Sequence, residues 1–350
     1  MNNAQIQSLT GVRFFAAIWV VCYHFKGFFH ELLPWLDPLQ WLFAKGDLAV
    51  PFFFILSGFI LSYNYHSYKL SFHLEFIWRR FARLWPVHFA TLCMFYSCFY
   101  AASKIGVYCN TSNFNLTVLP PELLMVRSWY DTRFMFNIPA WSIQAEWFAY
   151  IFIFPFCYFL FRKKRHISVE ILVPFFLLVV YALFPMRAIP GKLSAIIFPF
   201  IAGAALYRLR KSTNQFNNSG FWVWVSVCGI FLFLGSPYLS SVLKTGLFPF
   251  FGMLIFALSY EKGIVNDFLK SRLLLYGGAI SYSLYMTHHF IEYLYFPVFA
   301  RLHLVNPLAK SFAGILVFLG TLGLAAFFYH FIEEPSHRFL RKVKFKALLF

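Results

Sequence analysis

Acidic residues are scarce in this chain. Only 13 of its 350 residues are Asp or Glu, and charged residues of both signs make up 12% of the sequence. A soluble domain carries about twice that charged fraction, so the composition excludes an ordinary water-soluble enzyme. Hydrophobic residues reach 60%, and the apolar stretches recur along the whole chain. The sequence therefore predicts an integral membrane protein with many spans.

The sequence also lacks the patterns of a metal site and of a cleavable signal. Its 6 cysteines include no CxxC pair and no His/Cys ligand spacing, so we expect inert thiols, no metal and no permanently bound cofactor. The first apolar segment has no Lys or Arg before Arg13 and no small-residue cleavage site after it. We interpret this segment as a retained first span.

Positive charge is plentiful, with a net charge of +17, but it lies in short segments between apolar stretches. That distribution is typical of membrane topology and excludes nucleic acid as a partner. Because a helix satisfies its backbone amides locally in hydrocarbon, we expect an all-α transmembrane bundle. About ten spans are predicted, at 12–31, 48–65, 86–105, 141–161, 169–186, 192–209, 220–236, 245–260, 273–295 and 310–331.

The basic residues also predict the orientation. With the N-terminus inside, the inner segments hold about twice as many Lys and Arg residues as the outer ones, so both termini are expected in the cytoplasm. The longest outer segment, roughly 106–140, contains three prolines and could fold as an external cap. No repeat or soluble domain is visible, so residues 1–350 are expected to form a single transmembrane domain.

Ionisable side chains inside spans are costly, which makes them the first candidates for function. Arg13 and His24 are eleven residues apart in the first span, about three helical turns or ~16 Å, and on nearly the same face. The guanidinium would lie at the cytoplasmic mouth and the imidazole near the middle of the membrane. A snorkelling Arg and a structural, hydrogen-bonded His would fit the pair equally well.

A cluster of arginines precedes the third expected span. Arg79 and Arg83 are four residues apart and Arg80 and Arg83 three, so their side chains can converge on one helix face. Guanidinium groups bind phosphate through paired hydrogen bonds. Pro86 would kink the next span or start it. The cluster predicts a cytoplasmic phosphate site, and the alternative is a loop that only sets topology.

Polar residues also mark the second, fourth and ninth spans. Ser142 and Glu146 share a face at the outer start of the fourth, and a carboxylate there needs a partner or a water-filled cavity. The ninth carries a helical stripe of Ser281, Tyr285, His288 and Glu292, which could line a cavity or form a hydrogen-bonded seam between helices. Before and in the second span we note Asp47 as a further cavity candidate, and Ser57 and Gly58 as a site of close helix packing.

Together these motifs resemble the acyltransferase-3 family of integral membrane O-acyltransferases. The marks, in the family's order, are Arg13-x10-His24, Phe-Phe-Ile-Leu-Ser-Gly-Phe at 53–59, Phe76-Ile-x-Arg-Arg-x-x-Arg-Leu-x-Pro86, Trp141-Ser-x3-Glu146, Ser281-Tyr-Ser-Leu-Tyr285 and Glu333-Glu334-Pro335. They cover residues 9 to about 340. One departure is Ala49, where the family usually has a second small glycine.

The resemblance implies a ten-helix fold, a cytoplasmic donor of the acetyl-CoA type as co-substrate, and O-acylation of a saccharide acceptor. The residues agree, since a phosphate-rich donor needs cytoplasmic arginines and a hydroxyl acceptor needs a base that titrates near neutrality, as His does. We predict that Arg13, Arg79, Arg80 and Arg83 bind the donor and that His24 removes the hydroxyl proton. Glu146 would polarise the imidazole or position the sugar, and an acyl-His intermediate is a second option.

The expected setting is the bacterial cytoplasmic membrane, with acyl-CoA, a saccharide and the lipid bilayer as partners, and with glycan-biosynthesis proteins as further candidates. The main alternative is a transporter or flippase in which Arg and His line a path, although no inverted repeat is visible. A scaffold without chemistry is the third hypothesis. It predicts that His24 and Glu146 can be replaced without effect.

Overall fold

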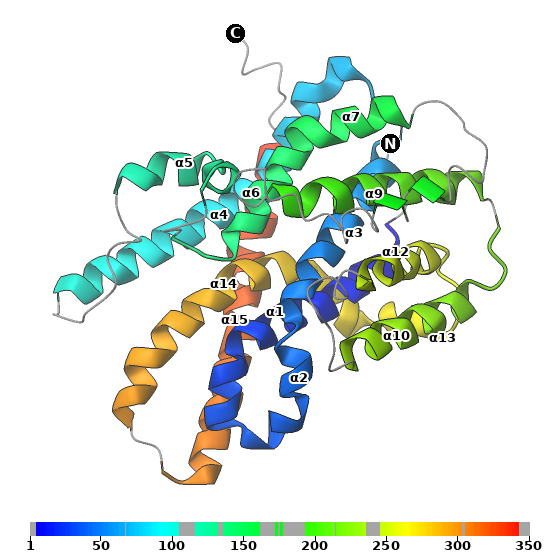
Figure 1. The fold of residues 1–350 in the computed structure, drawn as a ribbon. Coiled ribbons are helices and arrows are strands. Elements are labelled where there is room, and N and C mark those ends of the chain that lie inside the picture. Colours follow the sequence, from blue (N-terminus) through cyan, green and yellow to red (C-terminus); the bar gives the residue numbers. More distant parts are fainter. Residues whose placement is uncertain are drawn as a thin grey trace. The chain divides into compact units, whose positions relative to one another are not determined.

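The computed structural model consists of helices and the turns between them, and no strand occurs among the residues that it describes (Figure 1). These residues are 5–66, 68–104, 116–131, 136–161, 172–173, 176–177, 193–213, 215–235, 246–302 and 305–342. Of the expected spans, 169–186 lies almost entirely outside this set. The all-helical prediction is confirmed for the part of the chain that can be seen.

The chain folds into two compact units. The first comprises Met1–Ala16, Leu48–His73 and Phe148–Ala279, and the second comprises Ala17–Asp47, Leu74–Trp147 and Ile280–Phe350. Two long helices, α1 (Gln7–Leu32) and α14 (Arg272–Leu302), have residues in both units.

Most of the remaining helices belong to one unit. The first contains α3 (Ala49–Asn64), η3 (Leu70–Phe72), the π-helical turn η7 (Ala149–Ile153), α7 (Phe154–Leu160), α9 (Ser194–Ser212), α10 (Ser219–Gly235), α12 (Leu247–Leu258) and α13 (Ile264–Leu269). The second contains η1 (Pro34–Leu39), α2 (Gln40–Phe43), nearly all of α4 (His73–Lys104) and of α6 (Ala140–Phe148), η5 (Leu116–Val118), α5 (Leu119–Leu123), η6 (Arg127–Trp129), α15 (Pro307–Phe328), the π-helical turn η8 (Tyr329–Glu333) and α16 (Glu334–Lys342). The short turn η2 (Gly46–Leu48) ends at the boundary between them.

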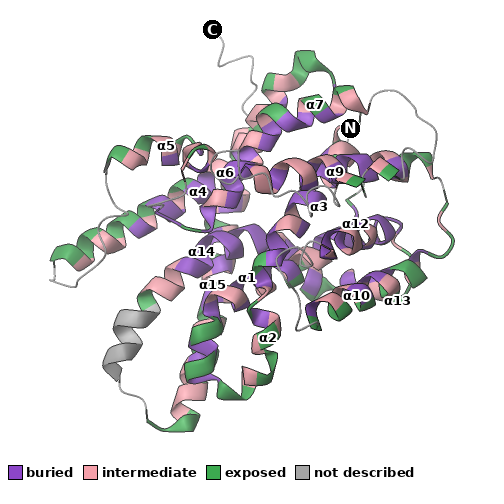
Figure 2. Ribbon diagram, in the orientation of Figure 1, coloured by how far each residue is buried: buried purple, intermediate pink, exposed green. Residues whose placement is uncertain are grey.

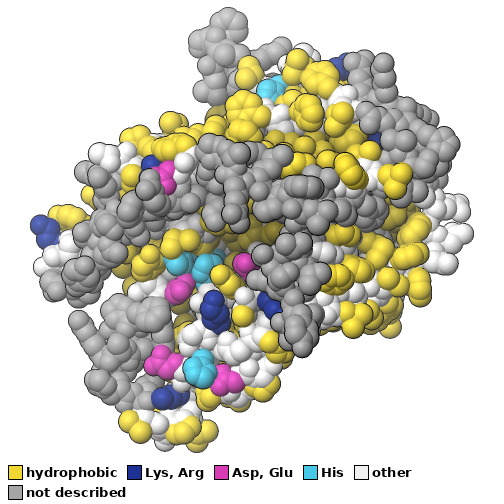
Figure 3. Space-filling model, viewed as in Figure 1, with side chains coloured by type: hydrophobic (Ala, Val, Ile, Leu, Met, Phe, Trp, Pro, Cys, Tyr) yellow, Lys and Arg dark blue, Asp and Glu magenta, His cyan; other side chains and the backbone are white. Residues whose placement is uncertain are grey.

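Among the described residues, four helical segments are long and apolar enough to cross a membrane. They are Gln7–Leu32, Gly46–Asn64, Ala140–Leu160 and Pro307–Lys342, and the shorter apolar helices are α10 and α12. Large exposed hydrophobic side chains such as Leu232 on α10 and Leu319 on α15 suit a surface that faces lipid. On the face drawn in Figure 3, many of the charged and His side chains gather over α1, α2 and α14, and hydrophobic side chains cover much of the remaining described surface.

Helix α4 differs from its expected bounds. It begins at His73, well before the predicted start at 86, and continues through Pro86 to Lys104. The arginine cluster is therefore helical and does not form a loop. Glu75 pairs with Arg79 one turn later on the same helix face, a spacing that is typical of a helix.

Within the first unit, α3 and α9 pack at backbone contact. A Cβ atom placed on Gly58 would lie 2.0 Å from the carbonyl oxygen of Phe200, and one placed on Gly203 would lie 2.0 Å from the carbonyl oxygen of Ile55. Only a residue without a side chain fits at either position. The close packing predicted at Gly58 is confirmed, and Gly203 is its counterpart on α9.

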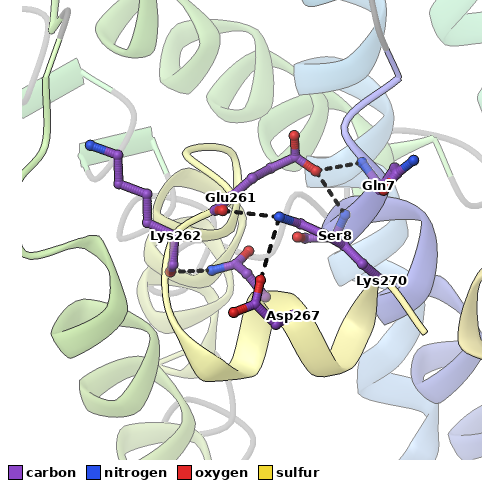
Figure 4. A network of polar contacts seen from close by, with 7 residues as sticks. Gln7, Ser8, Glu261, Lys262, Asp267 and Lys270 are labelled. Carbon is purple, nitrogen blue, oxygen red and sulfur yellow. Dashed lines mark hydrogen bonds and ion pairs between the residues drawn. The ribbon is translucent and has the colours of Figure 1, made fainter.

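The start of α1 is fixed by a carboxylate from the segment between α12 and α13 (Figure 4). Glu261 Oε1 accepts hydrogen bonds from the backbone amides of Gln7 and Ser8 at 2.8 and 3.4 Å. Those amides have no partner inside the helix, and a negative charge at a helix N-terminus is favourable. Lys270 Nζ donates to the Glu261 carbonyl at 3.0 Å and holds this segment in place. Arg13 lies in the same part of α1, so this cap helps to position it.

In the second unit, a buried network joins the residues after α4 to α6. Gln144 Nε2 donates to Glu122 Oε2 at 2.7 Å, and Gln144 Oε1 accepts from the Ser128 amide at 2.7 Å. The ring of His88 donates to the Glu122 carbonyl at 2.8 Å. Burial raises the pKa of Glu122 to about 7, against the opposing effect of its hydrogen bond from Gln144. This network connects the segment after α4 to α4 and α6; residues 105–115 and 132–135 lie outside the described part of the chain, and the external position of the segment stays a prediction.

Candidate active site

His24 lies on α1 with its ring turned toward polar groups of α14 in the same unit. Its Nδ1 is 3.5 Å from Glu292 Oε2, and its ring centroid is 5.0 Å from that of His288 and 5.5 Å from that of His289. The side chains of His24 and Glu292 are 21% and 25% exposed, so the pair is accessible as well as packed. The imidazole is therefore neither directed entirely to lipid nor enclosed.

Glu292 contacts two imidazoles at once. The oxygen that faces His24 is also 2.7 Å from His289 Nδ1. An ionised carboxylate only accepts hydrogen bonds, so His289 donates through Nδ1. A carboxylate at Nδ1 fixes the orientation of a histidine and stabilises its protonated form, as in other His–carboxylate pairs. For His24, this arrangement leaves Nε2 as the nitrogen that can take a proton.

The neighbouring histidines bring further ring nitrogens to this region. His288 Nδ1 donates to the Leu284 carbonyl at 3.2 Å. The Nε2 atoms of His288 and His289 are buried, and neither has a hydrogen-bond partner among the described residues. A buried polar atom without a partner is costly unless a ligand or water serves it. The two Nε2 atoms are therefore candidates for contact with a polar ligand.

Helix α14 is well suited to build such a site. Every residue from 280 to 289 is buried, as the central part of α14 in Figure 2 shows. Within this run, the hydroxyl of Tyr285 is 2.7 Å from Ser142 Oγ and donates to the Pro139 carbonyl at 3.1 Å. Asn137 Nδ2 donates to the Met286 carbonyl at 2.8 Å. The structure thus brings Ser142 and Tyr285 together as part of a hydrogen-bonded seam between α6 and α14.

The other cavity candidates have different surroundings. Ser281 is buried on α14, whereas Asp47 is exposed in η2 and lies within electrostatic range of Tyr23. Glu146 is half-buried on α6, one turn after Ser142, and lies within electrostatic range of Tyr285. The assignment of Glu146 to orienting His24 stays a prediction.

The arginine cluster is already engaged with acidic and aromatic groups. Arg79 forms an exposed ion pair with Glu75 at 2.5 Å. Arg83 Nη1 lies 2.5 Å from Glu333 Oε1, and Glu333 is only 1% exposed. The guanidinium of Arg80 lies 6.0 Å from the ring centroid of Phe76.

Arg83 and Arg13, two of the arginines predicted to bind the donor, have different surroundings. Ser283 Oγ donates to the second oxygen of Glu333 at 2.6 Å, so α14 also supports the Arg83 ion pair. Arg13 is half-buried on α1 in the first unit. The role of the four arginines in donor binding stays a prediction.

Sequence reasoning missed the pairing of His24 with Glu292 and the participation of His289. Glu292 was recognised as part of the polar stripe, but the stripe alone does not say which helix it faces. The available signal was the spacing of His289 and Glu292, three residues apart on one helix face. The C-terminal motif contributes in an unexpected way too, since its Glu333 forms the buried ion pair with Arg83.

His24, His289 and Glu292 could in principle hold a metal ion, because one donor atom from each lies within 4.8 Å of the others. The distance of 2.7 Å between His289 Nδ1 and Glu292 Oε2 is that of a direct hydrogen bond. Two donors bound tetrahedrally to zinc, each about 2.0 Å from the ion, stay roughly 3.3 Å apart. His289 and Glu292 are thus closer together than two zinc ligands, whereas His24 Nδ1, 3.5 Å from the same oxygen, is not.

Comparison with known proteins places this geometry in context. Acyltransferase MdmB of Streptomyces mycarofaciens is 33% identical over 165 residues, which cover 45% of this chain and 41% of that protein. O-acetyltransferase OatA of Staphylococcus aureus is 25% identical over 99% of this chain and 58% of its own length. Protein 2 in the picA locus of Rhizobium radiobacter is 30% identical over 118 residues, covering 33% of this chain and 56% of that protein.

The chain thus spans about half the length of the curated relatives it matches. No solved structure matches it significantly. The family model described as an acyltransferase domain matches residues 6–330, which include His24 and Glu292. A match over nearly the whole sequence establishes that this chain belongs to the acyltransferase-3 family.

Proposed function

We propose that the protein is an O-acyltransferase of the bacterial cytoplasmic membrane. It moves an acyl group, normally acetyl, from acyl-CoA on the inner side to a hydroxyl group of a surface or exported saccharide. The chain crosses the membrane about ten times with both termini inside. Support comes from the family membership, from a relative named as an O-acetyltransferase, and from apolar helices separated by basic segments.

The observation that carries this proposal is the contact of His24 Nδ1 with Glu292 Oε2 at 3.5 Å in a partly exposed cluster. Nε2 of His24 removes the proton of the acceptor hydroxyl as its oxygen attacks the thioester carbonyl. The carbon–sulfur bond then breaks, and the imidazolium returns the proton to the departing thiolate. The products are the ester and the free thiol of coenzyme A. Glu292 is a positioning residue that holds the ring and offsets the charge it acquires.

The donor approaches from the cytoplasmic end, where the arginines lie. Arg79 and Arg80 contact its phosphates together with Arg13, and Arg83 is held in place by Glu333. Ser283, which supports that ion pair, and His289 are six residues apart on α14, about 9 Å along the helix axis. One rigid helix therefore supports both ends of the reaction path. Glu146 positions the acceptor from the outer side.

The test uses purified protein, radiolabelled acetyl-CoA and glycan or lipid from the membrane as acceptor. His24→Gln is expected to reduce covalent transfer of label by a factor of about 10²–10⁴, the usual contribution of a general base. Glu292→Gln is expected to lower kcat by about 10-fold or more and to leave KM for the donor nearly unchanged. This split separates a positioning role from general misfolding.

His30→Gln is the matched control. His30 lies on the same helix and its Nδ1 contacts a carboxylate oxygen of Asp37 at 3.0 Å, but this pair is exposed. The control is expected to keep full activity. Transfer of label by His24→Gln at the wild-type rate would refute the mechanism, and transport of label without covalent transfer would favour the flippase.

A further inference from the structure

A cavity of about 130 Å³ in the first unit is built from residues that the proposed reaction does not use. It lies where α3, α7 and α9 end: Tyr65 and His66 follow α3, Phe161 follows α7, and Arg208 and Lys211 lie in the last turns of α9. The distribution of basic residues predicts that all three ends face the cytoplasm. The cavity is therefore expected at the inner surface of the membrane.

The lining is rich in hydrogen-bond donors. Arg208, Lys211 and His66 all line the cavity, and no carboxylate occurs in the described lining. Three tyrosines add hydroxyl groups, and the apolar part includes Phe154, Cys157 and Phe161; the tyrosines are Tyr65, Tyr158 and Tyr207. Cations and hydroxyls above an apolar wall are the features that hold an anionic group at a membrane surface.

Basic residues at the end of a helix often only complement the helix dipole. The backbone hydrogen bonds at the three helix ends show how the chain itself ends each helix. Each is closed by a backbone hydrogen bond, from Tyr65 to Leu61, from Phe161 to Cys157 and from Thr213 to Leu209. Arg210, in the same turn of α9, does not line the cavity, and its guanidinium lies 3.8 Å from the ring centroid of Tyr260.

The cavity, at about 130 Å³, has room for a phosphate group. Guanidinium, ammonium and hydroxyl donors together match the oxygens of a phosphate.

We propose that this cavity binds one phosphate group of a larger ligand, with Arg208 and Lys211 as the charged contacts. Two sources carry that chemistry at the inner membrane surface: the headgroup of an anionic phospholipid and the nucleotide end of an acyl-CoA donor. Binding of the donor here rests on the proposed function, whereas binding of a lipid does not. A failure of label transfer would therefore leave the lipid arm of the test unaffected.

The test measures the thermal stability of the full chain in nanodiscs. One arm adds coenzyme A to nanodiscs of phosphatidylcholine, and the other replaces part of that lipid with phosphatidylglycerol. Either coenzyme A or phosphatidylglycerol is expected to raise the melting temperature of the wild type, and the one that does so identifies the source of the phosphate. The rise is expected to be smaller at high salt. Arg208→Gln and Lys211→Gln are each expected to lose at least half of that rise.

Arg210→Gln removes the same charge from the same helical turn and is expected to keep the full rise. Lys211 is exposed, so its variant keeps the test valid if Arg208→Gln does not fold. No stabilisation of the wild type by either probe would overturn the proposal. Equal responses of the three variants would do so too, because binding would then not depend on the cavity.

Discussion

Replacing Arg83 by Met should destabilise the protein far more than replacing Arg79. Arg83 Nη1 lies 2.5 Å from Glu333 Oε1, and Glu333 is 1% exposed. Without the guanidinium, this buried carboxylate keeps the hydroxyl of Ser283 as its described partner. Arg79 also has a carboxylate partner at 2.5 Å, but in that pair both side chains are more than 40% exposed, at 44% and 43%.

The expected magnitudes follow from burial. Breaking a buried ion pair by removing one member costs about 3–5 kcal/mol, because the remaining charge is left uncompensated. Arg83 is itself 27% exposed, so some water reaches the site and about 3 kcal/mol is the better expectation. An exposed pair such as Arg79–Glu75 contributes about 0–1 kcal/mol.

A second substitution tests the cause. In the double variant Arg83→Met with Glu333→Gln, no buried charge remains, and the amide oxygen can still accept from Ser283. Replacing both members of a buried pair is often close to neutral, so we expect recovery of most of the lost stability. The assay is thermal unfolding of the single and double variants in one detergent, with Arg79→Met as the control.

Two outcomes would refute this reasoning. One is an Arg83→Met protein as stable as Arg79→Met, and the other is a double variant no better than the single one. If the double variant recovers, its affinity for coenzyme A tests the predicted donor role of Arg83 apart from stability. Unchanged affinity would then assign Arg83 to structure alone.

Three more predictions concern packing, pH and metal. Gly58→Ala should lower the free energy of unfolding by about 1–3 kcal/mol, because the new Cβ would lie 2.0 Å from a backbone oxygen. At Gly27 a Cβ meets nothing within 4 Å, so Gly27→Ala should leave stability unchanged or raise it. Thermal unfolding of the two variants compares them. The pKa of Glu122 is raised to about 7 on folding, so the folded state holds its proton more tightly. The contribution of Glu122 to the free energy of unfolding should be largest below pH 4.5 and fall by up to about 3 kcal/mol as the pH rises from 4.5 through 7. Glu122→Gln should abolish that part of the slope, and an unchanged slope would contradict it. EDTA should leave label transfer intact, because His289 and Glu292 are hydrogen-bonded to each other and need no metal between them. Finding stoichiometric zinc in the purified protein would contradict this prediction.

The helices could be predicted because their signal is local. Apolar runs of about 20 residues predict spans wherever they occur, and α1, α3 and α15 lie close to their expected positions. Helix α4 was placed too late because a charged segment interrupts the hydropathy pattern. There the ion pair between Glu75 and Arg79 was the better indicator of helix.

The sequence could predict which residues belong to the candidate site, but not which of them contact each other. His24 and the stripe on α14 stand out because titratable groups in apolar segments are costly. The contact of His24 with Glu292 joins residues 268 positions apart, and no local pattern encodes which helices become neighbours. The same holds for Arg83 and Glu333, which are separated by 250 positions and were seen only as parts of two different motifs.

The way α14 satisfies its polar groups explains why its histidines are the best candidates for contact with substrate. In its buried run, Ser283 donates to Glu333, Thr287 donates to the Ser283 carbonyl, and Tyr285 pairs with Ser142. These bonds fix the rotation of the helix and give each hydroxyl a partner, as a low-dielectric interior requires. Among the described side chains of the run, the buried polar atoms without a partner are the Nε2 atoms of His288 and His289, next to His24. The helix thus satisfies its hydroxyls and leaves one ring nitrogen of each histidine without a described partner, near the partly exposed imidazole of His24, which supports the proposed contact with a polar substrate.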